Sequence, residues 1–89
     1  MQNPADGTIT MFTTTWCGYC RVLKQALNRA DIGFSEVNIE QVPEAADFVM
    51  HANGGNRTVP TVLFPDGSFA TNPSLAEVKA RLEAARPAP

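Results

Sequence analysis

The sequence predicts a single α/β domain in which four strands and three helices follow in the order β-α-β-α-β-β-α, as a four-stranded mixed sheet flanked by the helices. The chain of 89 residues is long enough for one hydrophobic core and too short for two. Its apolar share of 44%, with 18% charged residues, is that of a folded globule. Runs of β-branched residues alternate with stretches of helical periodicity, which indicates strand-helix-strand units.

The first half of the chain predicts a strand, a helix and a strand. Residues 8–13 are mostly β-branched or aromatic and follow a glycine, as in a buried strand. Residues 17–30 carry apolar side chains at helical spacing, and Gly33 marks the helix stop. Residues 34–40 alternate between apolar and polar side chains, which is typical of a half-buried strand beside the first one.

The second half begins with a helix and a hairpin. Pro43 suits a first helical position, and the helix that it opens reaches about Ala52, before Asn-Gly-Gly-Asn breaks it. Residues 61–64 and 68–71 are short apolar runs on either side of a Pro-Asp-Gly turn. This arrangement predicts a β-hairpin.

The last helix is predicted to open at Asn72 and Pro73, the first as its cap and the second as its first helical residue. Its apolar stripe against the sheet comprises Leu75, Val78 and Leu82. The first six residues include three polar residues and a proline, and Arg-Pro-Ala-Pro closes the chain. We therefore expect mobile ends and a core of about residues 7–86 within one domain of residues 1–89.

Charge and hydropathy exclude several classes of partner. Seven basic against nine acidic residues give a formal charge of -2, so the chain lacks the basic footprint that nucleic-acid binding needs. Its start has no basic segment followed by a long apolar run, and no segment approaches the ~18 apolar residues of a membrane span. We expect a cytoplasmic monomer with no nucleic-acid or membrane partner.

The predicted topology brings two distant segments to one edge of the sheet. A strand-helix-strand crossover is right-handed and makes the first two strands parallel. If the strand at residues 61–64 runs antiparallel to the strand at residues 8–13, its beginning lies beside the end of that strand. Cys17 and Pro60 are then neighbours despite the sequence between them.

Cys17 and Cys20 form a Cys-x-x-Cys pair, a spacing that favours redox chemistry. A thiolate attacks disulfides, and a free cysteine with a pKa near ~8.5 is mostly protonated at neutral pH. Cys17 lies where strand gives way to helix, so unpaired N–H groups and the positive helix end favour its anion, with Arg21 adding a positive field. We predict that Cys17 attacks and that the more buried Cys20 can resolve the mixed disulfide.

Other interpretations of these residues stay open. A structural disulfide between the cysteines would close too short a loop to stabilise much. Zinc needs about four ligands, and apart from carboxylates the chain adds only His51 to the two cysteines, so no metal is expected. His51 is most simply a surface residue. Trp16 is either core filler or a ring that faces the substrate.

Thr58-Val59-Pro60 leads into the predicted hairpin. Proline cannot donate to a strand ladder, and a cis bond before Pro60 would present the backbone N–H and C=O of Val59 outward. An extended disulfide substrate could pair with that backbone. With the cysteine pair at the same edge of the sheet, the tripeptide predicts a substrate-binding segment.

Residues 16–20 and 58–60, together with the strand order, resemble the glutaredoxins across nearly the whole chain. The resemblance implies a thioredoxin-like fold and a disulfide reductase. It also implies a nucleophile at Cys17, a second cysteine at Cys20 and a cis-proline at Pro60.

More narrowly, residues 17–20, 53–62 and 71–73 resemble the mycoredoxins, glutaredoxin-like reductases of mycothiol-using actinobacteria. Glutaredoxins usually place a lysine where this chain has Thr14, and their Gly-Gly-x-Asp segment ends here at Ser74, so two glutathione anchors are missing. Mycothiol is an acetylated cysteine joined to an amino-sugar and an inositol, with many hydroxyls and no free carboxylate. Neutral polar groups therefore suit it better than charged ones.

The predicted substrate-binding residues surround the cysteines, and all but one are uncharged. They are Thr14, Trp16, Gly18, Tyr19, Arg57, Thr58, Val59, Pro60, Asn72 and Ser74. Arg57 departs from the pattern, because a cation of this kind can hold a carboxylate in glutaredoxins. It could instead stack, contact a protein substrate or be solvated.

The resemblance implies that Cys17 reduces protein-mycothiol mixed disulfides by a monothiol mechanism, with mycothiol as co-substrate and no bound cofactor. NADPH would enter through a mycothiol disulfide reductase. Two alternatives stay open. A dithiol redoxin would donate electrons to ribonucleotide reductase or another enzyme and be recharged by thioredoxin reductase or glutathione, although the Trp-Ser-Gly-Phe-Arg-Pro-like segment of ribonucleotide-reductase redoxins is missing. A non-catalytic thioredoxin-fold module would use the groove to hold a partner.

Overall fold

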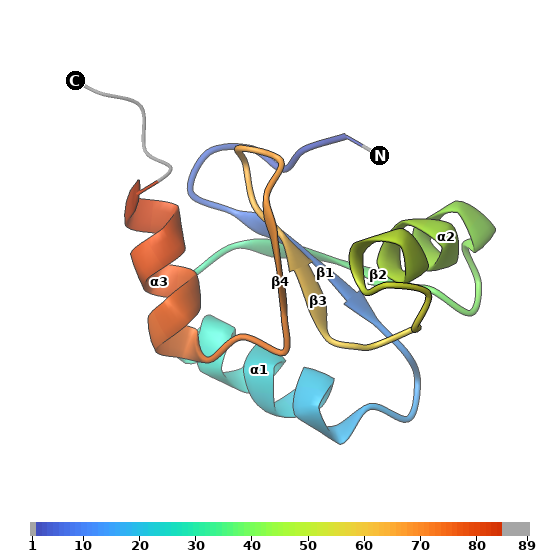
Figure 1. Cartoon of the computed structure of the whole chain (residues 1–89). Coiled ribbons are helices and arrows are strands. Elements are labelled where there is room, and N and C mark those ends of the chain that lie inside the picture. The colour runs from blue at the N-terminus through green and yellow to red at the C-terminus, as the bar shows by residue number, and fades with distance from the viewer. Residues whose placement is uncertain (1, 85–89) are drawn as a thin grey trace.

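The computed structural model describes residues 2–84. Its elements follow the predicted order (Figure 1) and are β1 (Ile9–Thr13), α1 (Gly18–Arg29), β2 (Phe34–Asn38), α2 (Pro43–Ala52), β3 (Thr61–Leu63), β4 (Phe69–Thr71) and α3 (Leu75–Ala84). The predicted limit of the core at about residue 86 and the closing Arg-Pro-Ala-Pro lie outside the described residues. No helix in the described part of the chain has the length and apolar character needed to cross a membrane.

The four strands form one mixed sheet in the order β2-β1-β3-β4. β1 runs parallel to β2, with Ile9 opposite Phe34. It runs antiparallel to β3, with Phe12 opposite Thr61, and β3 pairs antiparallel with β4. The predicted mixed topology is confirmed, including the antiparallel pairing on which the convergence of the two site segments depends.

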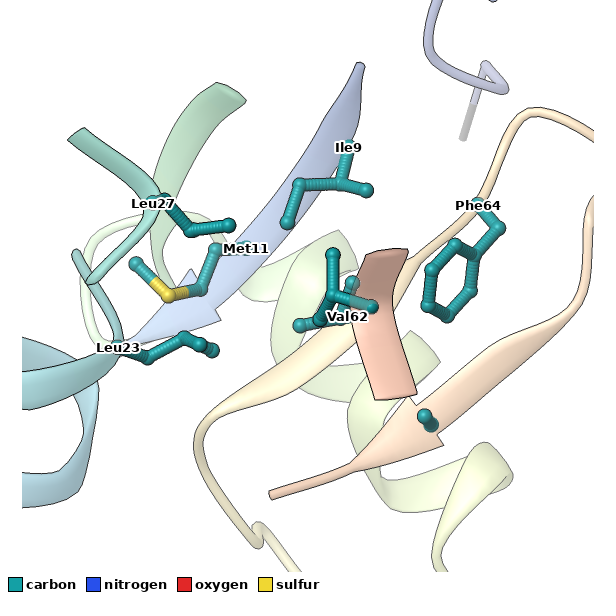
Figure 2. Packing of buried hydrophobic residues seen from close by; sticks show 8 residues of the cluster. Ile9, Met11, Leu23, Leu27, Val62 and Phe64 are labelled. Atoms are coloured by element: carbon teal, nitrogen blue, oxygen red, sulfur yellow. The ribbon is translucent and has the colours of Figure 1, made fainter. Parts of the chain in front are cut away.

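Helices cover both faces of the sheet (Figure 1), so the central strand β1 is buried along its whole length. On one face, where α1 and α3 pack, Figure 2 shows the larger core cluster, which consists of Ile9, Met11, Leu23, Leu27, Val62, Phe64, Ala70 and Val78. On the face of α2 a second cluster consists of Phe12, Ile39, Ala45, Ala46, Val49 and Leu63. The alternation of side chains along β1 thus supplies both cores.

The first helix ends earlier than predicted, and Gly33 is not its stop. Asp31 takes the left-handed conformation with φ of 58°. The Ile32 N–H donates to the Leu27 carbonyl (3.0 Å), a bond that spans the end of the helix as in a Schellman motif. Aspartate tolerates this conformation better than most residues, so it replaces the expected glycine.

The last helix begins later than predicted, and its cap is Ser74 instead of Asn72. The Ser74 hydroxyl accepts from the Glu77 N–H at 3.1 Å. Asn72 has φ of 47° and donates its backbone N–H to the Pro60 carbonyl at 2.7 Å, so it belongs to the turn that ends β4. Pro73 is therefore not the first helical residue. The second strand likewise ends at Asn38, because the Asn38 side chain accepts the Glu40 N–H (2.8 Å) in a turn.

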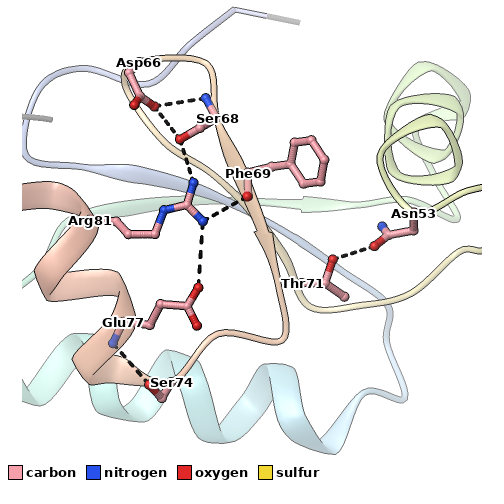
Figure 3. Close-up of polar contacts among 8 residues, drawn as sticks. All are labelled: Asn53, Asp66, Ser68, Phe69, Thr71, Ser74, Glu77 and Arg81. Carbon is pink, nitrogen blue, oxygen red and sulfur yellow. Dashed lines mark hydrogen bonds and ion pairs between the residues drawn. The ribbon is translucent and has the colours of Figure 1, made fainter. Parts of the chain in front are cut away.

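Arg81 of α3 holds the β3–β4 hairpin against the helix (Figure 3). Its guanidinium donates to the Phe69 carbonyl (3.0 Å) and to the Ser68 hydroxyl (2.8 Å), and it lies 4.4 Å from the centre of the Phe64 ring. The Ser68 hydroxyl in turn donates to Asp66 (2.6 Å), and this hydrogen bond lowers the pKa of the Asp66 carboxyl. One side chain thus links the turn, β4 and the core.

Arg81→Lys is expected to lower the free energy of unfolding by ~1–2 kcal/mol, because an ammonium keeps the charge but loses the planar fork and part of the ring contact. Urea unfolding measures this loss. Arg29→Lys makes the same chemical change at an exposed position in the last turn of α1 and is the matched control. Equal losses in the two variants would contradict the anchoring role of Arg81.

Candidate active site

Cys17 is the N-cap residue of α1. Its backbone is extended (φ −86°, ψ 105°), and its sulfur accepts the Cys20 N–H at an N–Sγ distance of 3.0 Å. The first turn of the helix contains no acidic residue. Because the N–H groups of a first turn have no partner within the helix, they and the helix dipole stabilise negative charge on a sulfur placed here. The predicted position of Cys17 at the junction of strand and helix is confirmed.

The sulfur atoms of Cys17 and Cys20 are joined in a disulfide. The Cys20 residue is 1% exposed, whereas Cys17 is partly exposed. The predicted difference in burial between the two cysteines is therefore confirmed. An incoming group can reach the Cys17 sulfur, while the Cys20 sulfur is positioned to react with its neighbour in the chain.

The segment before β3 lies at the same end of the sheet as the cysteine pair. The peptide bond before Pro60 is cis, as predicted. Because Thr61 lies opposite Phe12, the residues preceding β3 come beside the end of β1, from which the chain leads to Cys17 (Figure 1). The hydrogen bond from the Asn72 N–H to the Pro60 carbonyl adds the end of β4 to the same edge.

A pocket of about 380 Å³ lies beside the disulfide, between the start of α1 and the ends of β1 and β2. Both cysteines line it, together with Thr14 from the predicted substrate-binding set. The other lining residues are polar or charged and are Thr13, Thr15, Arg21, Lys24, Glu36, Asn38 and Gln41. Lys24 and Glu36 pair with each other at 3.1 Å, so that cation is already partnered. The pocket suits a polar ligand part more than an apolar one.

Tyr19, Asn72 and Ser74 lie elsewhere, around a smaller hollow of about 130 Å³ between α1 and the start of α3. The rest of its lining is mainly apolar and consists of Val22, Leu23, Ala26, Pro73 and Leu75. The structure thus separates the predicted neutral polar residues into two groups. Thr14 lies on the β2 side of α1, and Asn72 and Ser74 lie on its α3 side.

Three large apolar side chains, just before α1 and in its first turns, are exposed to solvent. Trp16 is 87% exposed, Tyr19 70% and Val22 65%. The interpretation of Trp16 as core filler is therefore wrong, and its ring is available to a partner. Exposed aromatic rings of this size are typical of surfaces that contact other molecules.

The remaining residues that the sequence singled out differ in how far they are exposed. Arg57 and Thr58 are exposed, and Val59 is half-buried against the α2-side core. Neither of the ion pairs found among residues 2–84 includes Arg57. A Cβ built at Gly18 would meet no atom within 4 Å, so space alone does not require glycine there. His51 is exposed, as predicted.

Sequence reasoning did not assign Lys24, Glu36, Asn38 and Gln41 to the site. Two patterns could have indicated the first three. Lys24 lies seven positions after Cys17 and therefore on the same face of α1. Glu36 and Asn38 lie on the polar side of the alternating β2, which is parallel to β1 and ends at the same edge of the sheet.

Metal binding gains no support from the described side chains. Within residues 2–84, no group of three or more His, Cys, Asp or Glu side chains lies close enough together to hold a metal ion. The chemistry that the arrangement offers is that of the two sulfurs.

Comparisons with known proteins agree with this chemistry. The sequence model of the family "Glutaredoxin" matches residues 9–69. A candidate glutaredoxin of Mycobacterium tuberculosis is 60% identical over 83% of this chain and 88% of its own length. Mycoredoxin 1 of Corynebacterium glutamicum is 43% identical over 85% of this chain and 94% of its own length. Among solved structures, the glutaredoxin-like NrdH-redoxin of Escherichia coli superimposes with a TM-score of 0.64 at 28% identity, covering 92% of this chain and 99% of that one.

Proposed function

The chain belongs to the glutaredoxin family and is a glutaredoxin-type disulfide oxidoreductase, and from that premise we propose that it reduces mixed disulfides between mycothiol and proteins. The observation that carries the proposal is Thr14 beside Cys17, a neutral hydroxyl where glutathione-using relatives usually place a lysine. The 43% identity to a protein named mycoredoxin supports it. Mycothiol has hydroxyls to pair with and no carboxylate that would need a cation.

The first step follows from the exposure of Cys17. Its thiolate attacks the mycothiol sulfur of the mixed disulfide, and a new bond forms between Cys17 and mycothiol. The bond between mycothiol and the protein breaks, and the protein sulfur leaves as a thiolate that takes a proton from solvent. The protein substrate is thereby reduced. The exposed rings of Trp16 and Tyr19 offer the surface on which its backbone can lie.

A second mycothiol completes the cycle. Its thiolate attacks the sulfur of the bound mycothiol, so that Cys17 leaves as a thiolate and mycothiol disulfide forms. A reductase that uses NADPH would return this disulfide to the thiol, which is why the chain itself needs no bound cofactor. Cys20 is not used on this route. It can instead expel mycothiol and close the intramolecular disulfide, which a further thiol must then reopen.

The proposal is tested by NADPH consumption with three recharging systems, supplied with the same mycothiolated protein. The systems are mycothiol with its reductase, glutathione with its reductase, and thioredoxin reductase alone. We expect the highest kcat/KM with mycothiol. A preference for glutathione would overturn the choice of co-substrate and leave the disulfide oxidoreductase class intact.

A dithiol electron donor is the second candidate, favoured by the likeness to the NrdH-redoxin and by the Cys17–Cys20 disulfide itself. Such a redoxin passes both electrons from the cysteine pair to a target enzyme. In the same assay it would turn over with thioredoxin reductase alone. Under either function, a cytoplasmic location and a monomeric state stay predictions of the sequence.

A further inference from the structure

Asn53, the C-cap residue of α2, joins three elements through its side chain. Its carboxamide nitrogen donates to the Val49 carbonyl of α2 at 2.8 Å and to the Thr61 hydroxyl of β3 at 3.1 Å. Its carboxamide oxygen accepts from the Thr71 hydroxyl of β4 at 2.5 Å, the bond that Figure 3 shows. The primary amide therefore uses both N–H donors and its acceptor at a single junction.

Thr61 links Asn53 to the predicted substrate-binding segment through its hydroxyl. Its side chain is fully buried, and its hydroxyl donates to the Thr58 carbonyl at 2.8 Å while it accepts from Asn53. Thr58 and Thr61 bracket the Val59–Pro60 peptide bond. A continuous set of hydrogen bonds thus leads from the end of α2 to the Thr58 carbonyl, immediately before Val59.

Hydrogen bonds, and not packing, hold the chain that leads up to Val59, which itself packs partly against the α2-side core. Residues 54–58 are all exposed, and Gly54 and Gly55 have positive φ values of 65° and 101°. A loop with few buried contacts is held only where polar groups hold it. On the far side the Asn72 N–H fixes the Pro60 carbonyl, so Asn53 and Thr61 supply the hold on the near side.

We propose that Asn53 is a positioning residue for substrate, which sets the backbone of Val59 in the orientation that pairs with an extended disulfide. The inference rests on the role of Val59 in the proposed function but not on which thiol is the co-substrate. Asn53 touches neither sulfur nor substrate. Its removal should therefore weaken substrate binding and leave the reactivity of Cys17 unchanged.

The test uses Asn53→Ala, Thr61→Val and the double variant, with Thr61→Ser to restore the hydroxyl. Asn56→Ala, in the same exposed loop, is the matched control, because among the described residues its side chain bonds the Asn53 backbone carbonyl (3.4 Å) and neither Thr61 nor Thr71. KM and kcat are measured with a mycothiolated peptide and with a symmetrical peptide disulfide, and the reduced proteins are alkylated with iodoacetamide. We expect KM to rise roughly fivefold to tenfold in Asn53→Ala and Thr61→Val, with kcat and alkylation rate unchanged. The double variant should show little further rise, and Thr61→Ser should approach the wild type.

An unchanged KM in Asn53→Ala, or an equal rise in Asn56→Ala, would overturn the inference. If Asn53→Ala does not fold, Thr71→Val removes the donor to the same carboxamide from an exposed position and must raise KM in the same sense. If the wild type reduces the peptide disulfide but not the mycothiolated peptide, mycothiol is the wrong co-substrate and the role of Asn53 is still open to test. The KM values of the variants are then compared on the peptide disulfide, where an unchanged KM in Asn53→Ala or an equal rise in Asn56→Ala overturns the inference.

Discussion

Cys17→Ser is expected to abolish disulfide reduction, whereas Cys20→Ser is expected to keep reduction of mycothiolated proteins. A serine hydroxyl is not ionised at neutral pH and cannot form the mixed disulfide, so no step of the cycle remains. On the monothiol route Cys20 takes no part, and its replacement removes only the competing intramolecular disulfide. Turnover of a mycothiolated protein in the mycothiol-coupled assay measures both variants.

The same variants separate the alternatives. If Cys20→Ser is as inactive as Cys17→Ser, the monothiol route is wrong and a dithiol mechanism takes its place. Measuring the alkylation rate of Cys17 in Cys20→Ser across pH adds a control without substrate. The pH midpoint of this rate should lie below that of a free cysteine, because Cys17 lies at the N-terminus of α1. An unreactive Cys17 thiol at neutral pH would instead favour a non-catalytic binding module.

The order of elements and the edge at which the site forms could be predicted from the sequence, because both depend on local patterns and on strand topology. Alternation identified β2, helical spacing identified α1, and the Asp-Gly turn identified the hairpin. Once β3 is antiparallel to β1, Pro60 must lie beside the chain that leads to Cys17. The burial of Cys20 follows from the same reasoning, since it lies one turn inside the helix.

The errors arose where contacts between distant residues compete with local preference. Asn72 and Ser74 are both good caps, and local sequence does not choose between them. The Pro60 carbonyl, which lies just before β3, accepts the Asn72 N–H and leaves the cap to Ser74. Similarly, the local sequence around Thr14 does not reveal that Thr14 and Asn72 lie in different hollows, on opposite sides of α1.

The preference for mycothiol over glutathione should respond strongly to charge at Thr14 and Ser74. The wild type is expected to prefer mycothiol to glutathione by roughly a hundredfold in kcat/KM, because two charge-assisted contacts to glutathione are missing. Thr14→Lys combined with Ser74→Asp restores a cation for a glutathione carboxylate and an anion for its amino group. Aspartate also caps helices well, so the start of α3 should survive the change.

In this double variant we expect kcat/KM with glutathione to rise at least about tenfold and that with mycothiol to fall, as the coupled assays with the two reductases measure. Thr14→Gln combined with Ser74→Asn supplies side chains of similar length without charge. A gain in this neutral pair would mean that reach, and not charge, selects the thiol. If kcat/KM with glutathione rises in neither double variant, the two hollows on either side of α1 do not govern co-substrate choice. Arg57, the one cation of the predicted substrate-binding set, then becomes the residue to change.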